Sequence, residues 1–492
     1  METRELFKRL RAQGAMIERL SPDSRRCAPG VAFFAFPGDA ADGRAHIPEA
    51  LARGAAAVLW EEDGFSWRQE WRVPNAAVRG LRQQAGRLAH EFYGRPSADL
   101  WVCGVTGTNG KTSCTQWLAA ALGARGEKTG VIGTLGGGFP GALAELATTT
   151  PDALELHRML ADMRHAGARA VAMEVSSHAL VQGRVNGVAF ACALFTNLSH
   201  EHLDYHGSME AYAEAKARLF DAPGAAVLNL DDVLGVRLAQ RLAARGLRTI
   251  GYSLSAGAVA PGSVREYVAA RAIEAGADAT RVALESSWGA AEFSLSQLGR
   301  YSAANALGVL GCLLAHGVPF AQGVAALESL PQVPGRMQRV GGAGEPLVVI
   351  DYAHTPDALE KVLQALRPVA VARGGRLVAV FGAGGDRDRS KRSPMGAVAA
   401  RLADRVVLTS DNPRSEDPRA ILEAIRVGVP GPCELEPDRA RAIERALTQA
   451  AAADVLLLAG KGHETWQEIA GERLPFSDAQ AARAALERRR QR

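Results

Sequence analysis

The sequence predicts an α/β protein of three domains, with a central P-loop-type doubly wound sheet and a C-terminal Rossmann-like domain. Short apolar runs alternate with helical patterns along most of the chain. A Gly-rich turn between an expected strand and an expected helix has the chemistry of a phosphate cradle. The chain has 492 residues, 47% of them hydrophobic, which is enough for several cores. We expect domains at residues 1–97, 98–334 and 335–492.

The first domain alternates apolar runs, such as 31–36 and 55–60, with Ala/Arg-rich helical patterns. Residues 93–97 read Tyr-Gly-Arg-Pro-Ser and form a breaker-rich boundary. The first domain is therefore expected to be a small α/β unit that ends just before the central one.

The second domain opens with an apolar run at 100–105, which predicts a buried strand, followed by a predicted helix over 113–122. Further strands are expected at 170–175, 193–196 and 225–229. The third domain repeats the plan, with strands expected at 347–351, 376–381, 405–409 and 454–459. Ligands of such sheets bind beyond the carboxyl ends of the strands, so the loops there are expected to carry chemistry.

The segment after the strand at 100–105 predicts an ATP site. Glycines let backbone N–H groups turn toward phosphate oxygens, a lysine reaches the outer phosphates, and the next hydroxyl can hold Mg²⁺. The residues are Gly107, Thr108, Asn109, Gly110, Lys111, Thr112 and Ser113. The spacing is not that of the common P-loop, which has a glycine where this chain has Val105. The alternative is a tight connection without a ligand.

Two segments of the second domain suggest a metal. Glu174 ends an expected strand and is a candidate Mg²⁺ ligand, the alternative being a solvated edge residue. Three histidines, His200, His202 and His206, crowd one short stretch. Asp204 stands where a helical zinc motif needs its second histidine, so zinc is disfavoured and a histidine beside Mg²⁺ is the better hypothesis.

Composition narrows the classes of partner. The formal net charge is +4 and the basic residues are spread along the chain, which favours neither nucleic-acid nor membrane binding. Six cysteines without a C-x-x-C pair indicate a reduced cytoplasmic protein and no structural zinc site. The Arg-rich end, 488–492, is expected to be a solvated tail. The chain is expected to be a monomer.

In combination, several ordered motifs resemble the Mur ligase family from end to end. They are Thr106-Gly-Thr-Asn-Gly-Lys-Thr112, Thr148-Thr-Thr-Pro151, Glu174-Val-Ser-Ser-His178, His202-Leu-Asp-Tyr-His206, Lys216 and Asp351-Tyr-Ala-His-Thr-Pro356. The resemblance implies ATP-driven amide formation through an acyl phosphate. It implies the member that adds meso-2,6-diaminopimelate to UDP-N-acetylmuramoyl-L-alanyl-D-glutamate, with a UDP-sugar-binding first domain.

The resemblance also assigns catalytic roles. Lys111 would grip the outer phosphates, while Thr112 and Glu174 would hold one Mg²⁺. His202 would assist a second Mg²⁺, and Lys216 would react with CO₂ to give a carbamate that acts as an oxygen donor. In isolation, Lys216 is one cation on an amphipathic helix.

Further positions match family contacts to ATP and to the nucleotide-peptide. Those expected to touch ATP are Asn305, Arg336 and Asp351. Taken alone, Asp351 could instead cap a helix. Those expected to touch the nucleotide-peptide are Ser24, Asp39, Ala40, Ala41, Thr149, Thr150, Ser176, Gln182 and Arg184. Thr148 departs from the family's frequent asparagine, and Pro22 and Asp39 occupy variable positions.

The incoming amino acid is expected at Asp411, Asn412, Pro413 and Arg414, with Arg387, Gly460 and Glu464. Diaminopimelate carries one carboxylate more than lysine, and an arginine can clamp that group with two hydrogen bonds. Without the family, Asn412-Pro413 predicts only a turn.

Three alternatives to this function remain. One is the L-lysine-adding ligase of the same family. A second is a folylpolyglutamate-synthase-like ligase, in which the first domain and the 411–414 motif have no place. The third is a nucleotide-dependent binding switch without catalysis, against which Lys111, Glu174, His202 and Lys216 argue.

Overall fold

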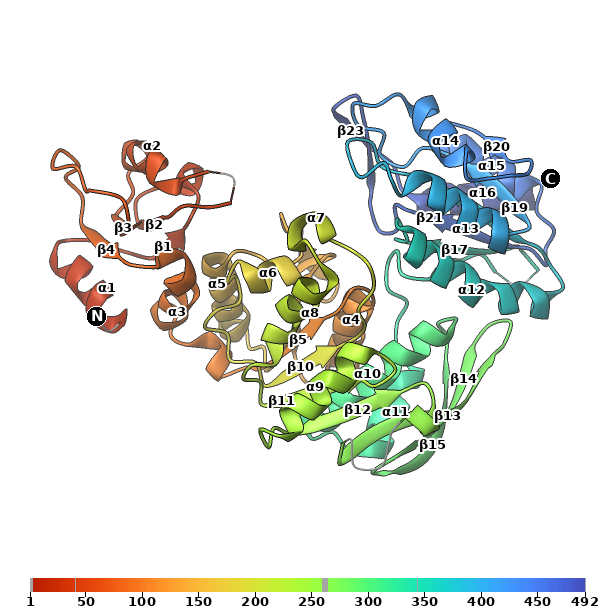
Figure 1. The fold of residues 1–492 in the computed structure, drawn as a ribbon, viewed down its shortest axis with the longest axis horizontal. Helices are drawn as coiled ribbons and strands as arrows, with labels where there is room; N and C mark the ends of the chain where they lie inside the picture. The colour runs from red at the N-terminus through yellow and green to blue at the C-terminus, as the bar shows by residue number, and fades with distance from the viewer. Residues whose placement is uncertain (1–2, 40, 259–263, 343, 492) are drawn as a thin grey trace. The chain divides into compact units, whose positions relative to one another are not determined.

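The computed structural model describes residues 3–39, 41–258, 264–342 and 344–491 (Figure 1). The chain divides into two compact units. One comprises residues 1–251 with 311–318, and the other comprises 252–310 with 319–492. No helix of the described ranges is both long and apolar enough to cross a bilayer.

The N-terminal sheet of the first unit has four parallel strands in the order β1-β2-β3-β4. Their bounds are Arg19–Ser21, Val31–Ala35, Ala57–Glu61 and Asn75–Val78. Successive side chains of a strand point to opposite faces. Phe34 therefore packs with helices α1 (Thr3–Ala12) and α3 (Leu81–Phe92), whereas Phe33 packs with α2 (Ile47–Ala52).

The second sheet of this unit is built around β5 (Trp101–Thr106), which pairs in parallel with β9 and β10. Its other strands within residues 1–251, besides β12 (Thr249–Ser253), are β6 (Thr129–Gly133), β7 (Gly136–Phe139), β8 (Ala142–Ala144), β9 (Ala170–Glu174), β10 (Cys192–Phe195) and β11 (Ala225–Asn229). Its helices are α4 (Lys111–Gly123), α5 (Ala153–His165), α6 (Ser177–Val181), α7 (Leu203–His206), α8 (Met209–Ala217) and α9 (Val233–Ala243). Because β5, β9 and β10 run the same way, the loops after them share one edge of the sheet.

Two elements cross from one unit to the other: β12 (Thr249–Ser253) and α10 (Arg300–His316). The second unit then holds three antiparallel strands, β13 (Glu266–Ala275), β14 (Thr280–Ser286) and β15 (Gly289–Leu295). Helix α11 (Phe320–Glu328) packs against β15.

The C-terminal sheet has the order β16-β17-β21-β18-β19-β20 and is parallel except for β16. Its strands are Gln338–Val340, Leu347–Asp351, Leu377–Phe381, Arg405–Leu408, Glu434–Leu435 and Val455–Ala459 for β16, β17, β18, β19, β20 and β21. Helices α12 (Pro356–Arg373), α13 (Arg392–Leu402) and α14 (Pro418–Arg426) share one core with it. Helices α15 (Arg439–Thr448) and α16 (Asp478–Arg490) share the other core. A hairpin of β22 (Trp466–Ile469) and β23 (Glu472–Pro475) lies between α15 and α16 in the chain.

The predicted fold class is confirmed, and the strands expected at 225–229 and 347–351 are found with those bounds. Helix ends differ more. The helix predicted over 113–122 already begins at Lys111, because Gly110 at φ 89° turns the chain into it. Helix α5 is capped by the Asp152 carboxylate, which accepts from the N–H groups of Leu154 and Glu155. The domain boundaries at 97 and 334 stay a prediction.

The Arg-rich end, expected to be a solvated tail, is helical at residues 488–490, and the side chains of Arg488 and Arg490 stay exposed there. These residues form the last turn of α16, where basic side chains suit the negative end of the helix. Arg490 pairs with Glu345 at 2.6 Å, and Arg488 pairs with Glu444 at 2.9 Å. Local sequence could not show these partners, since both carboxylates lie far away in the chain.

Three cysteines that are distant in sequence meet in the core of the first unit. The Sγ atoms of Cys103, Cys192 and Cys312 lie within 4.8 Å of one another, and all three side chains are buried. No histidine or carboxylate of the described residues joins this group. The thiols therefore lack the fourth ligand of a tetrahedral zinc site and pack as small apolar side chains.

Candidate active site

The loop between β5 and α4 has a backbone that only glycine can supply at its start. Gly107 has φ 144°, and a Cβ there would lie 1.9 Å from the Oγ1 of Thr196. Gly110 has φ 89° and precedes the first residue of α4. The two glycines bring the N-terminus of α4 to the end of β5, which is the geometry of an anion-binding turn.

The segment after β10 holds this loop in place. The N–H of Thr108 donates to the carbonyl of Asn197 at 2.8 Å, and the N–H of Asn109 donates to the Asn197 side chain at 3.1 Å. Thr196 closes the contact by donating from its hydroxyl to the Asn109 carbonyl at 2.6 Å. Thr196 and Asn197 are therefore supports of the loop that the sequence did not assign a role.

Two lysines converge on the first residue of the loop. Lys111 donates from Nζ to the carbonyls of Gly107 at 2.9 Å and Thr108 at 2.7 Å. Lys216 donates to the same Gly107 carbonyl at 2.8 Å, from α8. Two ammonium groups beside a helix N-terminus make this loop strongly attractive to anions.

Lys216 is buried, which excludes the reading as a surface cation. Its side chain is 1% exposed, and its Nζ lies 4.4 Å from the centre of the Tyr212 ring. Burial, followed by the charge of Lys111, lowers the pKa of Lys216 well below its usual value. A larger fraction of this amine is therefore neutral, which is the form that attacks CO₂.

Glu174 ends β9 and is 1% exposed, so it is not a solvated edge residue. Its carboxylate accepts from the Thr134 N–H at 2.8 Å and the Thr134 hydroxyl at 3.1 Å. The hydroxyl of Thr149 lies 3.2 Å from that of Thr134. A buried carboxylate among hydroxyls is a set of hard oxygen donors, and it fits Mg²⁺.

The histidine-rich segment contributes a cluster of rings. His202 precedes α7 at φ 57°, and its ring centre lies 4.9 Å from that of His178. Burial and the charges of Lys111 and Lys216 lower the pKa of His202, while burial lowers that of His178 to about 4. His206 bonds the Ser177 hydroxyl at 2.9 Å, and His200 is exposed. Neutral imidazoles so close to the lysines retain a lone pair for a metal or a proton.

The residues predicted to contact the nucleotide-peptide form two groups in the first unit. Asp39 pairs with Arg82 at 2.6 Å and accepts from Gln182 at 2.7 Å, and Arg82 is the main cause of the lowered pKa of Asp39. Arg184 donates to Gln182 at 2.7 Å and to the Thr150 carbonyl at 2.9 Å. The structure therefore brings Asp39, Gln182, Arg184 and Thr150 together.

Thr150 has further contacts, and Ser24 and Ala41 have separate partners. Thr150 is buried, donates to the Glu174 carbonyl at 2.9 Å and accepts from the Ser176 N–H at 3.1 Å. Ser24 donates to Glu49 at 2.7 Å. The carbonyl of Ala41 accepts from the N–H of Gly38, and Ala40 lies outside the described residues.

The second unit carries the other residues predicted for ATP. Asp351 ends β17 and accepts from the N–H groups of Met337 and Ala353, each at 2.9 Å. Burial raises the pKa of Asp351. The cap of α12 is Thr355, which excludes the alternative role of Asp351. Arg336 stacks 4.7 Å from the Tyr352 ring centre, and Asn305 is buried in α10.

The residues predicted for the amino acid meet at the carboxyl ends of β19 and β21. Arg414 is left-handed at φ 53° and donates from Nη1 to the Gly385 carbonyl at 2.7 Å. Gly460 has φ 108°, a backbone angle that favours glycine, and a Cβ there would lie 2.3 Å from the Asp411 carboxylate. Pro413 is buried in the loop. Arg387 is exposed and makes no hydrogen bond with another described residue.

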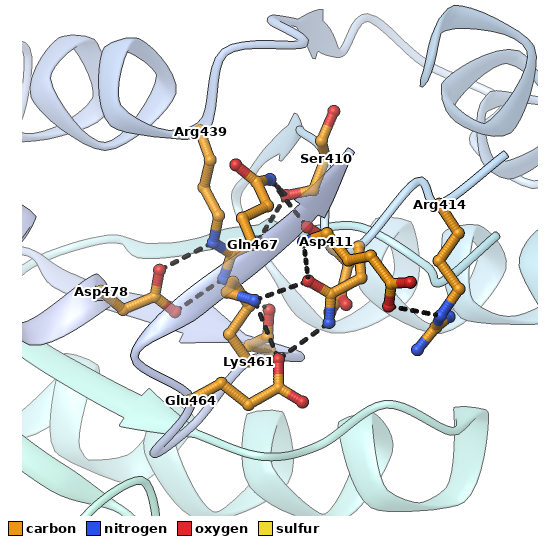
Figure 2. Close-up of polar contacts among 11 residues, drawn as sticks. Ser410, Asp411, Arg414, Arg439, Lys461, Glu464, Gln467 and Asp478 are labelled. Atoms are coloured by element: carbon orange, nitrogen blue, oxygen red, sulfur yellow. Dashed lines mark hydrogen bonds and ion pairs between the residues drawn. The ribbon is translucent and has the colours of Figure 1, made fainter. Parts of the chain in front are cut away.

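Lys461 connects Asn412 with Glu464 (Figure 2). The sequence did not assign this lysine to the site. Its side chain has no exposed surface, and Nζ donates to Asn412 at 3.0 Å and to Glu464 at 2.8 Å. Asn412 also donates to the same Glu464 oxygen, Oε2, at 2.8 Å. Glu464 is therefore fixed through one oxygen, which leaves Oε1 for an ammonium.

A buried ion pair lies behind these loops (Figure 2). Arg439 and Asp478 are fully buried and make two hydrogen bonds of 2.7 Å with each other. Arg439 also donates to the carbonyls of Ser410 at 3.2 Å and Ala459 at 2.9 Å. One guanidinium thus links the ends of β19 and β21, from which the two loops start.

Three family models match the chain. "Mur ligase family, catalytic domain" covers residues 16–93, "Mur ligase middle domain" covers 105–313, and "Mur ligase, glutamate ligase domain" covers 335–462. The chain belongs to the Mur ligase family. Its members are ATP-dependent ligases that form amide bonds.

Individual relatives are similar over nearly the whole chain. The UDP-N-acetylmuramoyl-L-alanyl-D-glutamate–2,6-diaminopimelate ligase of Chromobacterium violaceum is 50% identical over 97% of this chain and 96% of its own. A solved structure of a ligase with that name is 35% identical, with a TM-score of 0.68 over 96% of this chain and 95% of its own.

A folylpolyglutamate synthase from Mycobacterium tuberculosis, solved with ADP and AMPPCP, is 19% identical with a TM-score of 0.61. The match covers 77% of this chain and 92% of that one. At this identity the likeness shows a shared fold only.

The ranges matched by the Mur ligase models end before two residues that contact the Asp411–Arg414 loop. Gln467 and Glu468 lie beyond residue 462, in β22. Lys461 and Arg439 lie inside the matched range, but Asn412, which Lys461 contacts, and Asp478, which Arg439 contacts, are distant from them in sequence. The one sequence signal for Lys461 was the rarity of lysine, since the chain has only seven.

Proposed function

We propose that this chain joins meso-diaminopimelate to UDP-N-acetylmuramoyl-L-alanyl-D-glutamate at the expense of ATP, as a cytoplasmic monomer that makes a peptidoglycan precursor. The near-full-length similarity to ligases of that name carries the proposal. The two sites support it, because one is built for phosphate and the other offers an arginine and a carboxylate at the ends of parallel strands.

The first step would place the γ-phosphate of ATP at the N-terminus of α4. Gly107 to Ser113 would line the phosphates, with N–H groups from the first turn of α4 and with hydroxyls, and Lys111 would turn from the loop carbonyls to the outer phosphates. Asn305, Arg336 and Asp351 would also contact the nucleotide. The peptide carboxylate then attacks the γ-phosphorus, which releases ADP and leaves an acyl phosphate.

Mg²⁺, when bound, supplies charge neutralisation for the phosphoryl oxygens. Thr112 and Glu174 would hold one ion, and His202 would hold a second with the Lys216 carbamate. The neutral Lys216 amine attacks CO₂, a C–N bond forms, and a proton is lost, which turns a cation into an anionic oxygen donor. The lowered pKa of Lys216 supports this step.

The nucleotide-peptide would lie along the first unit. Asp39, Gln182 and Arg184 are already connected by hydrogen bonds, and Ser24, Ala40, Ala41, Thr149, Thr150 and Ser176 complete the proposed set. Residues 1–97 would form the UDP-sugar domain, residues 98–334 the ATP domain, and residues 335–492 the amino-acid domain.

In the amino-acid site, Arg414 would clamp the far carboxylate of diaminopimelate and Glu464 would accept from an ammonium. Arg387, Asp411, Asn412, Pro413 and Gly460 would shape the remaining wall. The amine of diaminopimelate then attacks the acyl phosphate, an amide bond forms, and phosphate leaves. Lysine lacks the second carboxylate and would leave the Arg414 guanidinium with unused donors.

Phosphate release by the purified chain tests this function. Reactions contain ATP, Mg²⁺ and the nucleotide-dipeptide, with meso-diaminopimelate, L-lysine or no amino acid. We expect release only with diaminopimelate. Equal or greater release with lysine would favour the lysine-adding alternative. Release with neither amino acid would favour the binding switch.

A further inference from the structure

The hairpin β22–β23 is attached to the loop that carries Arg414. The N–H of Arg414 donates to the Glu468 carbonyl at 3.0 Å, and the Arg414 carbonyl accepts from Ala470 at 2.7 Å. This pairing continues as a parallel bridge between Arg414 and Ile469. The backbone of the predicted specificity residue is thus held like one residue of a strand.

A second set of contacts comes from side chains. Gln467 donates from Nε2 to the Asp411 carbonyl at 2.7 Å (Figure 2). The N–H of Glu468 donates to the Asn412 side chain at 3.0 Å. The hairpin therefore contacts Asp411, Asn412 and Arg414, three of the four residues of the loop.

The Glu468 side chain acts on the guanidinium itself. Its Oε2 lies 3.3 Å from Nε of Arg414, while Nη1 of Arg414 donates to the Gly385 carbonyl at 2.7 Å. These two contacts hold the plane of the guanidinium through its Nε and Nη1 atoms. A guanidinium has five N–H donors, so those on Nη2 and the second on Nη1 remain for a ligand.

We propose that Glu468 is a positioning residue for the amino-acid substrate, which sets Arg414 for a two-bond clamp on a carboxylate. This inference rests on the proposed function. The Glu468–Arg414 pair keeps 26% and 20% of its side-chain surface exposed, and such pairs add little to stability. What the contact does supply is orientation, because an arginine held in one plane loses less rotamer freedom on binding.

The substitutions Glu468→Ala and Glu468→Gln separate orientation from charge. Alanine frees the guanidinium, whereas glutamine keeps an oxygen of similar reach beside Nε and removes only the charge. For Glu468→Ala we expect the KM for meso-diaminopimelate to rise about tenfold, with kcat and the KM for ATP unchanged. We expect its preference for diaminopimelate over L-lysine to fall by about the same factor, and Glu468→Gln to stay within about twofold of the unsubstituted protein.

Glu472 provides a matched control. It is an exposed glutamate on β23 of the same hairpin and pairs through its backbone with Ile469. Glu472→Ala should leave every kinetic constant as in the unsubstituted protein, and thermal unfolding of all variants checks their folding.

The outcomes separate this inference from the function beneath it. An unchanged KM in Glu468→Ala would overturn the inference alone. So would a parallel loss of kcat, ATP affinity and stability, which indicates a merely structural role, or a glutamine variant as impaired as alanine. An unsubstituted protein that forms no amide with diaminopimelate would overturn both.

Discussion

The phosphate loop in the first unit and the Asp411–Arg414 loop in the second are held by different kinds of contact. The first takes its turn from two glycines of the motif and accepts from the motif's own Lys111, and Asn197 and Lys216 brace it from neighbouring segments. The second is fixed by side chains from distant segments, including Arg439, Lys461 and Gln467.

The difference shows what a short motif can and cannot encode. A turn that receives phosphate needs particular backbone angles, and glycine, lysine and threonine at fixed spacing supply them. A pocket that receives an amino acid needs charges placed at chosen distances, and those come from wherever the fold can bring them. Substitutions within the motif should therefore be enough to disable the first loop, whereas the second should also respond to substitutions at residues such as Arg439 and Lys461, far from it in the chain.

The largest expected effect is at Lys111. Lys111→Met removes the cation that would contact the outer phosphates, and we expect kcat to fall at least about a thousandfold. Phosphate release with both substrates measures it. Lys128→Met is the matched control, since this exposed lysine donates to the Ala166 carbonyl away from the loop. Near-normal turnover in Lys111→Met would contradict the assignment of the loop.

The second effect is on stability. Arg439→Met leaves Asp478 buried without its partner, and we expect the free energy of unfolding to fall by about 3 kcal/mol or more. Urea denaturation measures it. Arg488→Met is the control, because its pair with Glu444 is exposed. If both variants unfold alike, the buried pair does not hold the ends of β19 and β21 together.

A third test concerns Lys216. Arginine keeps the positive charge but cannot form a carbamate, so Lys216→Arg should lose about a hundredfold in kcat. Activity of the unsubstituted protein should also drop in CO₂-depleted buffer and return with bicarbonate. An active arginine variant would show that a cation, not a carbamate, is needed at this position.

The smallest effect concerns the pH dependence of stability that comes from His157 in α5, outside both loops. His157 is buried, its Nε2 donates to the Asn186 carbonyl at 3.0 Å, and its Nδ1 has no hydrogen-bond partner. Burial lowers its pKa from 6.5 to about 4. The folded state favours the neutral form of His157. Its contribution to the free energy of unfolding is therefore fully present above the pKa of the unfolded state, and it is lost as the pH falls toward 4.

From these values, titration of His157 should lower the free energy of unfolding by about 2 kcal/mol when the pH falls from 7.5 to 5. His157→Gln keeps a neutral donor toward Asn186, so this part of the pH dependence should disappear. Denaturation midpoints of the two proteins across this pH range provide the comparison. Parallel curves would mean that His157 is not the group that titrates.

Much of the fold could be predicted because its strands are buried on both faces and appear as continuous apolar runs. Residues 225–229 and 347–351 are examples, and the phosphate loop is another local signal. Helix ends were less accurate, since a cap such as Asp152 depends on backbone geometry.

The supports of the amino-acid site could not be predicted. Arg439 and Asp478 lie 39 residues apart, and Asn412 and Lys461 lie 49 apart. Their meeting depends on the sheet order, which places β21 between β17 and β18. No periodicity or spacing in the sequence contains that order. The resemblance to the family named the residues expected to face the ligand but not those that hold them.

One competition reaction tests the central claim most directly. The purified protein receives ATP, Mg²⁺, the nucleotide-dipeptide and equal concentrations of meso-diaminopimelate and L-lysine, and the product is identified by mass spectrometry. The account predicts a nucleotide-tripeptide that contains diaminopimelate almost exclusively. A product that contains mainly lysine, or no tripeptide at all, would contradict it.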